Sequence, residues 1–126
     1  DHCEAIRQIL KQGRDGETYC VGGDNQPSNL EIVRSICDLL DQKLPLSSGL
    51  PHATLIRFVT DRPGHDFRYD INTTKITREL GWKPKRNLQQ GLDETIDWYL
   101  TNTSWIQSVA QKEEFNQWLE KNYQQR

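Results

Sequence analysis

A strand–helix–strand pattern between residues 18 and 60 constrains the fold of this chain most strongly. Residues 18–21 and 55–60 are rich in β-branched and aromatic side chains, which is typical of short strands. Between them, Ser28 and Glu31 have the spacing of a capping box, and an apolar stripe at helical spacing continues to about Lys43. Two strands joined through a helix form a parallel pair with a right-handed crossover. The sequence therefore predicts a small βαβ unit.

The second predicted strand leads into the loop DRPGHDFRY, residues 61–69. Pro63 fixes its own φ and Gly64 permits φ values closed to other residues, so the backbone can turn sharply here. Arg62 and His65 supply hydrogen-bond donors, and a guanidinium can bind a phosphate through two parallel hydrogen bonds. A surface turn whose charges are solvated, or paired with the loop's own aspartates, explains the same composition equally well.

The position of this loop favours a binding site. Ligands of parallel α/β structures gather at the carboxyl ends of the strands, and both residues 22–29 and residues 61–69 follow such ends. Asn29 would lie in the first turn of the helix, where unpaired backbone N–H groups favour an anion, although a helix start alone also accounts for it. Gly22 and Gly23 do not open a dinucleotide fingerprint, because no third glycine follows at the helix start.

The remaining apolar residues recur at helical spacing. They predict helices over residues 1–12, from Asn72 or Thr73 to Gly81, from Asn87 to about residue 100, and over residues 112–122. Trp82 is expected to pack over the end of the second of these helices. Trp98 and Trp105 are interpreted as packing residues, because aromatic residues at helical spacing are more often core than cofactor contacts.

Length and charge narrow the functional classes. A chain of 126 residues suffices for one domain with a modest core. The net charge of −2 argues against a general nucleic-acid-binding protein. Residues 57–86 nevertheless hold eight basic and four acidic residues, a local charge of +4. Such a zone on an acidic chain suits a small anionic ligand better than a nucleic acid.

The cysteines and the chain's composition suggest a cellular setting. Three cysteines without a CxxC spacing argue against a disulfide framework or a zinc site, and Cys20 and Cys37 are expected to be buried thiols. His52 is expected to be exposed and without a role. No signal peptide or long apolar span is present, so we expect a cytoplasmic protein that does not bind membranes. The absence of Met suggests that the chain is part of a longer protein.

Four stretches together carry a family resemblance. TYCVGGDNQPSNLEIVRSICDLLD, DRPGHDFRY, TTKITRELGWKP and GLDETIDWYL closely resemble the C-terminal portion of bacterial dTDP-glucose 4,6-dehydratases, members of the extended short-chain dehydrogenase/reductase superfamily. Related nucleotide-sugar epimerases share the YxxGG and ELGWxP elements, whereas the DRPGHD loop is more specific. The resemblance implies that residues 1–126 are a C-terminal nucleotide-sugar-binding domain. That domain would be a small, mainly helical α/β fold with the short parallel strand pair and without the N-terminal Rossmann domain.

The resemblance also implies an activity for the parent enzyme. It would convert dTDP-glucose to dTDP-4-keto-6-deoxyglucose with NAD held by the missing N-terminal domain, and it would be a homodimer. No catalytic, cofactor-binding or metal-binding residue is expected in this chain, because no Tyr is followed by Lys four residues on, as the family's reactive pair requires. The residues that match the family's contacts to the nucleotide diphosphate are Asn29, Asp61, Arg62, Pro63, Gly64, His65 and Tyr123.

Other interpretations stay open at this stage. Tyr123 lies on the same predicted helix face as Leu119, so it could simply anchor the tail. The chain could also be a fragment of another nucleotide-sugar epimerase or decarboxylase. A non-catalytic interaction module is the third alternative.

Overall fold

The computed structural model describes residues 1–61, 63–66 and 68–121. These residues divide into two compact units, the first made of residues 1–32 and 66–91 and the second of residues 33–65 together with the chain from 92 onward. Each unit is described by itself. The helices are α1 (His2–Gln12), α2 (Asn29–Lys43), the 3-10 helix η1 (His52–Leu55), α3 (Thr74–Leu80), α4 (Leu88–Thr101), α5 (Thr103–Ala110) and α6 (Glu113–Leu119).

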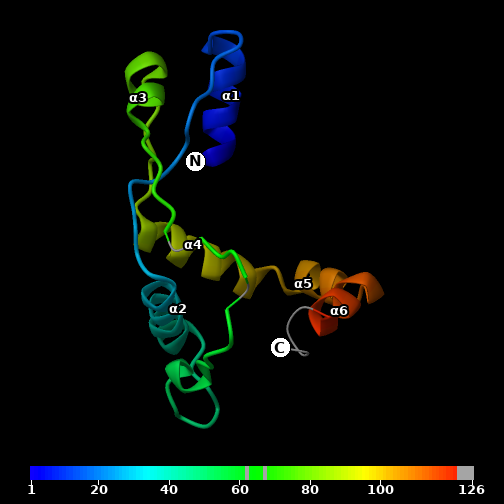
Figure 1. Cartoon of the computed structure of the whole chain (residues 1–126). Helices are drawn as coiled ribbons and strands as arrows, with labels where there is room; N and C mark the ends of the chain where they lie inside the picture. Colours follow the sequence, from blue (N-terminus) through cyan, green and yellow to red (C-terminus); the bar gives the residue numbers. More distant parts are fainter. Residues whose placement is uncertain (62, 67, 122–126) are drawn as a thin grey trace. The chain divides into compact units, whose positions relative to one another are not determined.

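The first unit has its core between α1 and α3, which lie side by side (Figure 1). Ala5 of α1 and Ile76 of α3 are completely buried, and Trp82 packs with them. Gly81 ends α3 in the left-handed conformation, at a φ of +67°, and its N–H donates to the carbonyl of Thr77. This turn carries Trp82 back over the helix end, as the sequence predicted.

Polar contacts hold the segment between α1 and the first extended run against α3. Glu79 accepts from Arg14 at 2.7 Å and from the Tyr19 hydroxyl at 3.2 Å. These contacts, the Arg14 ion pair foremost, lower the pKa of Glu79 from 4.5 to about 2. Lys75 lies over the Tyr19 ring and bonds Glu17 at 2.6 Å. The network fixes the entry to residues 18–26 on the surface of α3.

The second unit is built on α2 and the later part of α4. Cys37 and Leu39 of α2 are buried, as is Ile96 of α4. Lys43 bridges two carboxylates one turn apart on α4, Asp97 at 2.6 Å and Asp93 at 2.9 Å, and these bonds raise the pKa of Lys43. Helices α5 and α6 contact each other (Figure 1).

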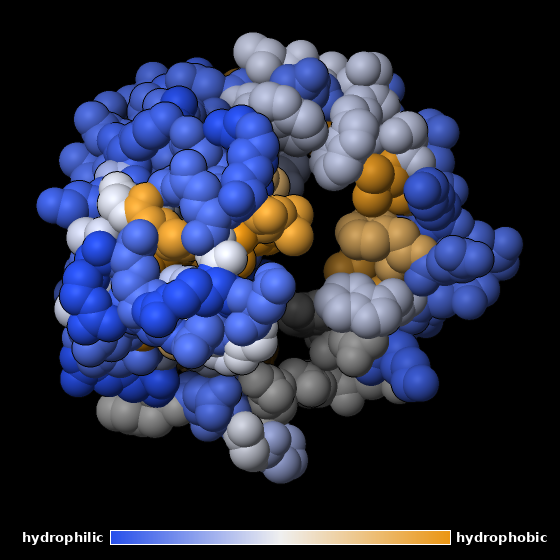
Figure 2. Space-filling model, turned by 90° about the horizontal axis from the view of Figure 1, so that it is seen from above, coloured by the Kyte–Doolittle hydropathy of each residue, from blue (hydrophilic) through white to orange (hydrophobic). Residues whose placement is uncertain are grey.

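Several large apolar side chains stay partly exposed. Trp98 stacks edge-on against Tyr99 and Trp105, with ring centroids 5.2 and 5.1 Å apart, yet each ring remains nearly half exposed. The prediction of buried packing residues therefore holds only in part at this cluster. Hydrophobic patches stand out on a largely hydrophilic surface in Figure 2. Leu10, Phe58 and Val59 are among the most exposed apolar residues.

The predicted parallel strand pair is wrong. Neither residues 18–21 nor residues 55–60 form a strand, and no other part of the described chain does. Leu55 instead ends η1, and Phe58 and Val59 are 84% and 72% exposed. A preference for strands reflects the fit of a side chain to a pleated, half-buried surface, and that surface requires a neighbouring strand. The two runs belong to different units, and without a partner each stays irregular.

The helix predictions fared better. The predicted helices correspond to α1, α2, α3, α4 and α6, whereas α5 was not predicted as a separate helix. The prediction of a buried thiol is confirmed for Cys37 and wrong for Cys20, which is exposed. Cys20 was expected to be buried within a strand, and residues 18–21 form no strand. The prediction that His52 is exposed is also wrong, because the residue is 8% exposed.

Candidate functional site

The predicted ligand loop bends at Gly64. Its φ of +69° lies in the left-handed region, where a side chain is strained, and a Cβ atom placed there would meet no other atom within 4 Å. The backbone conformation, and not lack of space, therefore favours glycine at this position. Pro63, which precedes it, is exposed.

The turn brings His65 onto Asp61. Nδ1 of His65 lies 2.6 Å from Oδ1 of Asp61, four residues earlier. The Asp61 side chain is 72% exposed and the imidazole is 28% exposed. The two residues form one hydrogen-bonded pair, and Nε2 is the ring nitrogen that this pair does not use.

Two of the predicted site residues, Arg62 and Tyr123, lie outside the described residues, so their roles stay predictions. Arg68, a further donor of the loop, is within 3.4 Å of Asp70. Both side chains are more than half exposed, and such surface pairs stabilise a fold very little. Arg68 therefore remains available to a stronger anionic partner.

Asn29 is the first residue of α2 and is exposed. The preceding Ser28 forms the predicted capping box: its N–H donates to Glu31 at 2.6 Å, and the N–H of Glu31 donates to the Ser28 hydroxyl at 3.3 Å. The bond from the Ser28 backbone N–H is the main cause of a lowered Glu31 pKa. The capping box already uses the backbone N–H groups of Ser28 and Glu31. A ligand at this point would therefore also need the Asn29 side chain.

The predicted site residues thus fall in both units. Residues 61–65 belong to the second unit and Asn29 to the first. Within the loop, the structure brings Asp61, Gly64 and His65 together. The structure gives Asn29 its own setting at the start of α2.

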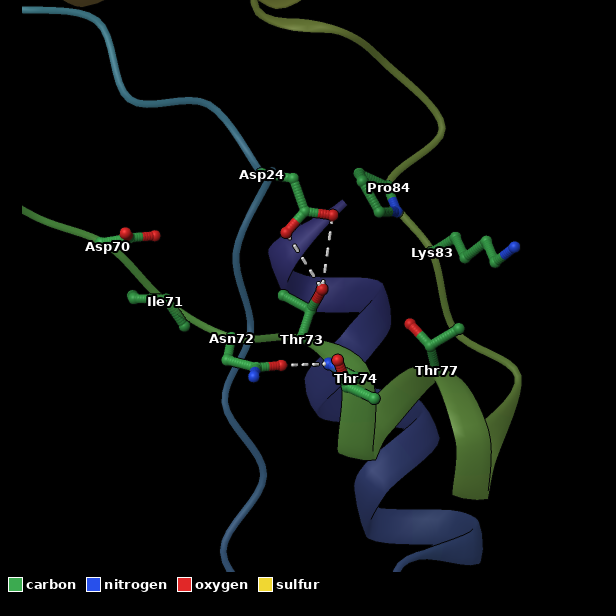
Figure 3. Close-up of a pocket in the computed structure, with 9 residues that line it drawn as sticks. All are labelled: Asp24, Asp70, Ile71, Asn72, Thr73, Thr74, Thr77, Lys83 and Pro84. Carbon is green, nitrogen blue, oxygen red and sulfur yellow. Dashed lines mark hydrogen bonds between the residues drawn. The ribbon is translucent and has the colours of Figure 1, made fainter.

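Sequence reasoning missed a polar pocket in the first unit, shown in Figure 3. This open pocket has a volume of about 910 Å³. Asp24 points at the hydroxyl of Thr73, which is 3.2 Å from its nearer carboxylate oxygen, and Asn72 accepts the N–H of Thr74 at 2.8 Å (Figure 3). The ammonium of Lys83 points away from these groups in the same view. The lining residues are Asp24, Asp70, Ile71, Asn72, Thr73, Thr74, Thr77, Lys83 and Pro84.

The turn after Gly22 and Gly23 forms one side of this pocket. Asp24 follows two glycines and has a φ of +52°, a left-handed conformation that aspartate tolerates better than most residues. Gly22 lies so close to Ile71 that a Cβ would be 3.3 Å from the Cβ of that residue. Gln26 also donates to Asp70. These contacts set the turn after the first extended run beside residues 69–73, and together the two segments line a second cavity of about 120 Å³.

His52 is part of a structural brace. Its backbone N–H donates to Oδ1 of Asp41 at 2.8 Å, and its Nδ1 lies 2.5 Å from the same oxygen. The backbone bond is the first cause of a lowered Asp41 pKa, and the imidazole is the second. The pair joins the end of α2 to η1. Sequence reasoning missed it because the two residues are eleven positions apart across a loop.

Much of the local positive charge is neutralised inside the chain. Lys75 pairs with Glu17, Arg78 with Glu79, and Lys85 with Glu4. Within the described residues, Arg57 and Lys83 take part in no recorded ion pair. The basic zone therefore offers a ligand less charge than the sequence suggested.

In residues 1–61, 63–66 and 68–121, no group of three or more His, Cys, Asp or Glu side chains is arranged to hold a metal ion. None of the helices in this part of the chain is long and apolar enough to span a bilayer.

Comparison with known proteins identifies the family. The family model described as GDP-mannose 4,6 dehydratase matches residues 1–95, which is most of the chain. The chain belongs to this family. The chain is also similar to a curated protein, a dTDP-glucose 4,6-dehydratase from Xanthomonas campestris, which is 54% identical over 109 residues, or 86% of this chain and 31% of that protein.

Two further relatives match, one over the whole chain and one in three dimensions. A dTDP-glucose 4,6-dehydratase 1 from Escherichia coli K12 is 42% identical over all 126 residues, which are 34% of that protein. The crystal structure of the dTDP-glucose 4,6-dehydratase of Bacillus anthracis in complex with NAD aligns with a TM-score of 0.68 at 42% identity. This alignment covers 82% of this chain and 30% of that one. The chain spans about a third of the length of the curated relatives it matches.

Proposed function

We propose that this chain is the nucleotide-sugar-binding part of a dTDP-glucose 4,6-dehydratase. The observation that carries the proposal is the identity of 42–54% to relatives of that name, which in several cases extends over the whole chain. At this level of identity the substrate class is generally shared. The mainly helical fold and its likeness to the NAD complex from Bacillus anthracis support it.

The parent enzyme would convert dTDP-glucose to dTDP-4-keto-6-deoxyglucose and water. Hydride would leave C4 of the sugar for NAD and return to C6 after water has been lost across C5 and C6. The chain has no glycine fingerprint of its own, since Gly22 and Gly23 are not followed by a third glycine at the start of α2. NAD would be held by a separate N-terminal domain. The parent enzyme would be cytoplasmic and a homodimer.

This chain would bind the nucleotide diphosphate, remote from the reacting carbons. Binding energy from such a remote group positions the reacting atoms against catalytic residues elsewhere. The loop of residues 61–65 would meet the diphosphate, with Arg62 as a bidentate donor and His65 as a single donor. Asn29 would contribute a neutral hydrogen bond, and Tyr123 would line the nucleotide pocket.

Calorimetric titration of the chain with dTDP, UDP and GDP tests the base preference. A clear preference for dTDP supports the proposal, whereas a preference for GDP would match the description of the family model instead. Equal binding of all three would contradict the preference for dTDP, and absent binding of all three would contradict a nucleotide-binding role. Since no Tyr-x-x-x-Lys pair is present, the purified chain with NAD should yield no 4-keto product from dTDP-glucose.

A further inference from the structure

The contact between Asp61 and His65 determines which ring nitrogen of His65 carries the hydrogen. A carboxylate oxygen can accept a hydrogen bond but cannot donate one, so the 2.6 Å contact with Nδ1 requires the hydrogen to be on Nδ1. The hydrogen bond made by one ring nitrogen decides which nitrogen of a neutral histidine is protonated. In this loop, Nδ1 is therefore the protonated nitrogen, and Nε2 is the one left for a ligand.

The contact between Asp61 and His65 is formed within the loop itself. The Pro63–Gly64 turn, with Gly64 in the left-handed region, reverses the chain so that residues four apart meet. The imidazole is 28% exposed, so it is partly fixed by its surroundings and still reachable. Asp61 lies further out, at 72% exposed. The contact between them therefore lies at the surface of the loop.

We propose that Asp61 is a positioning residue for His65: it keeps Nδ1 protonated and turns Nε2 toward the bound nucleotide diphosphate, to which Nε2 donates when the ring is an imidazolium. The part of this proposal that concerns the ligand rests on the proposed function above. In this proposal Asp61 does not itself contact the diphosphate, because a carboxylate beside a phosphate would repel it. The favourable effect of Asp61 on an anionic ligand then acts through the imidazole.

The first test needs no ligand. Long-range ¹H–¹⁵N spectra of the chain, recorded at a pH high enough that its three imidazoles are neutral, distinguish protonated from unprotonated ring nitrogens. His65 should carry its hydrogen on Nδ1, and Asp61→Ala should shift it toward a mixture of the two tautomers. His65→Gln assigns the signal. His52, which is held by Asp41, is an internal control that Asp61→Ala should leave unchanged.

The matched control variant is Asp66→Ala, which removes an exposed aspartate from the same loop and should leave the His65 tautomer as it is. An Nε2-protonated His65 in the unsubstituted chain would overturn the proposal. Retention of the Nδ1 hydrogen in Asp61→Ala would also overturn it, because Asp61 would then not be its cause.

The second test measures dTDP affinity at a pH low enough that the imidazoles are charged, because only an imidazolium can donate from Nε2 while Nδ1 bonds Asp61. Charge repulsion alone predicts tighter binding when Asp61 is replaced by Ala, whereas loss of an oriented donor predicts binding about fivefold weaker, roughly one hydrogen bond. Weaker binding in Asp61→Ala with unchanged binding in Asp66→Ala supports the positioning role, and equal or tighter binding contradicts it. If the chain binds no dTDP but His65 has the expected tautomer, the proposed function fails while the pairing of Asp61 with His65 stands.

Discussion

Shortening Ile76 should selectively unfold the first unit. Ile76 is completely buried between α1 and Trp82. Ile76→Ala removes three carbon atoms, which corresponds to about 2.4 kcal/mol of transfer free energy, and the cavity brings the expected loss to about 2–5 kcal/mol. Ile76→Val removes one carbon and should cost about 0.5–1.5 kcal/mol. The expected loss for Ala is a large fraction of the stability of a small domain.

Urea titration followed by NMR can measure this loss at the right place, because the indole N–H of Trp82 reports on the first unit. A loss of about 3 kcal/mol should lower the urea midpoint of the Trp82 signal by more than about 1 M. Ile6→Ala is the matched control: it makes the same change on α1 at a side chain that is 45% exposed, and it should cost less than about 1 kcal/mol. An unchanged Trp82 midpoint in Ile76→Ala, or equal losses for the Val and Ala variants, would refute the argument from buried volume.

Three further predictions concern the helix ends and the acid range. Because the folded pKa of Glu79 is about 2 against 4.5 for the ordinary group, its contribution to stability is present above pH 4.5 and is lost as the pH falls toward 2. Thermal unfolding of Glu79→Gln should therefore change less over that range than that of the unsubstituted chain. Gly81→Ala places a side chain at a φ of +67° and should lower the stability of the first unit by about 1 kcal/mol, measured by urea unfolding. Ser28→Ala breaks the capping box and should cost about 1 kcal/mol, whereas Ser48→Ala in the loop after α2 should cost less.

The helix boundaries could be predicted because their causes are local. The capping box at Ser28 involves a partner three residues away, and Asn87 with Gln90 forms the same arrangement before α4, with bonds of 3.1 and 2.8 Å. Gly81 ends α3 through its own backbone conformation. Each of these signals is complete within one turn of chain, so neighbouring packing does not reverse it.

The strand prediction failed because its cause is not local. Residues 57–60 have the composition of a strand, but a strand exists only when a second segment satisfies its backbone groups. The polar pocket was missed for the same reason, since Asp24 and Thr73 are 49 residues apart in the sequence. No pattern within a short window connects an aspartate after two glycines with a threonine that precedes a helix.

The ligand loop lies between these two cases. Its turn was predicted from Pro63 and Gly64, and a turn of this kind brings residues four positions apart within hydrogen-bonding distance. Pairing of the loop's charges with its own aspartates was one of the two interpretations of its composition, but no specific partner for Asp61 was predicted. Considering the hydrogen-bonding capacity of each side chain would have favoured histidine as well, because a ring nitrogen that donates to a carboxylate leaves the opposite nitrogen for a ligand. A DxxxH spacing across a Pro-Gly turn thus predicts an oriented imidazole, and the tautomer measured in Asp61→Ala decides whether that prediction holds.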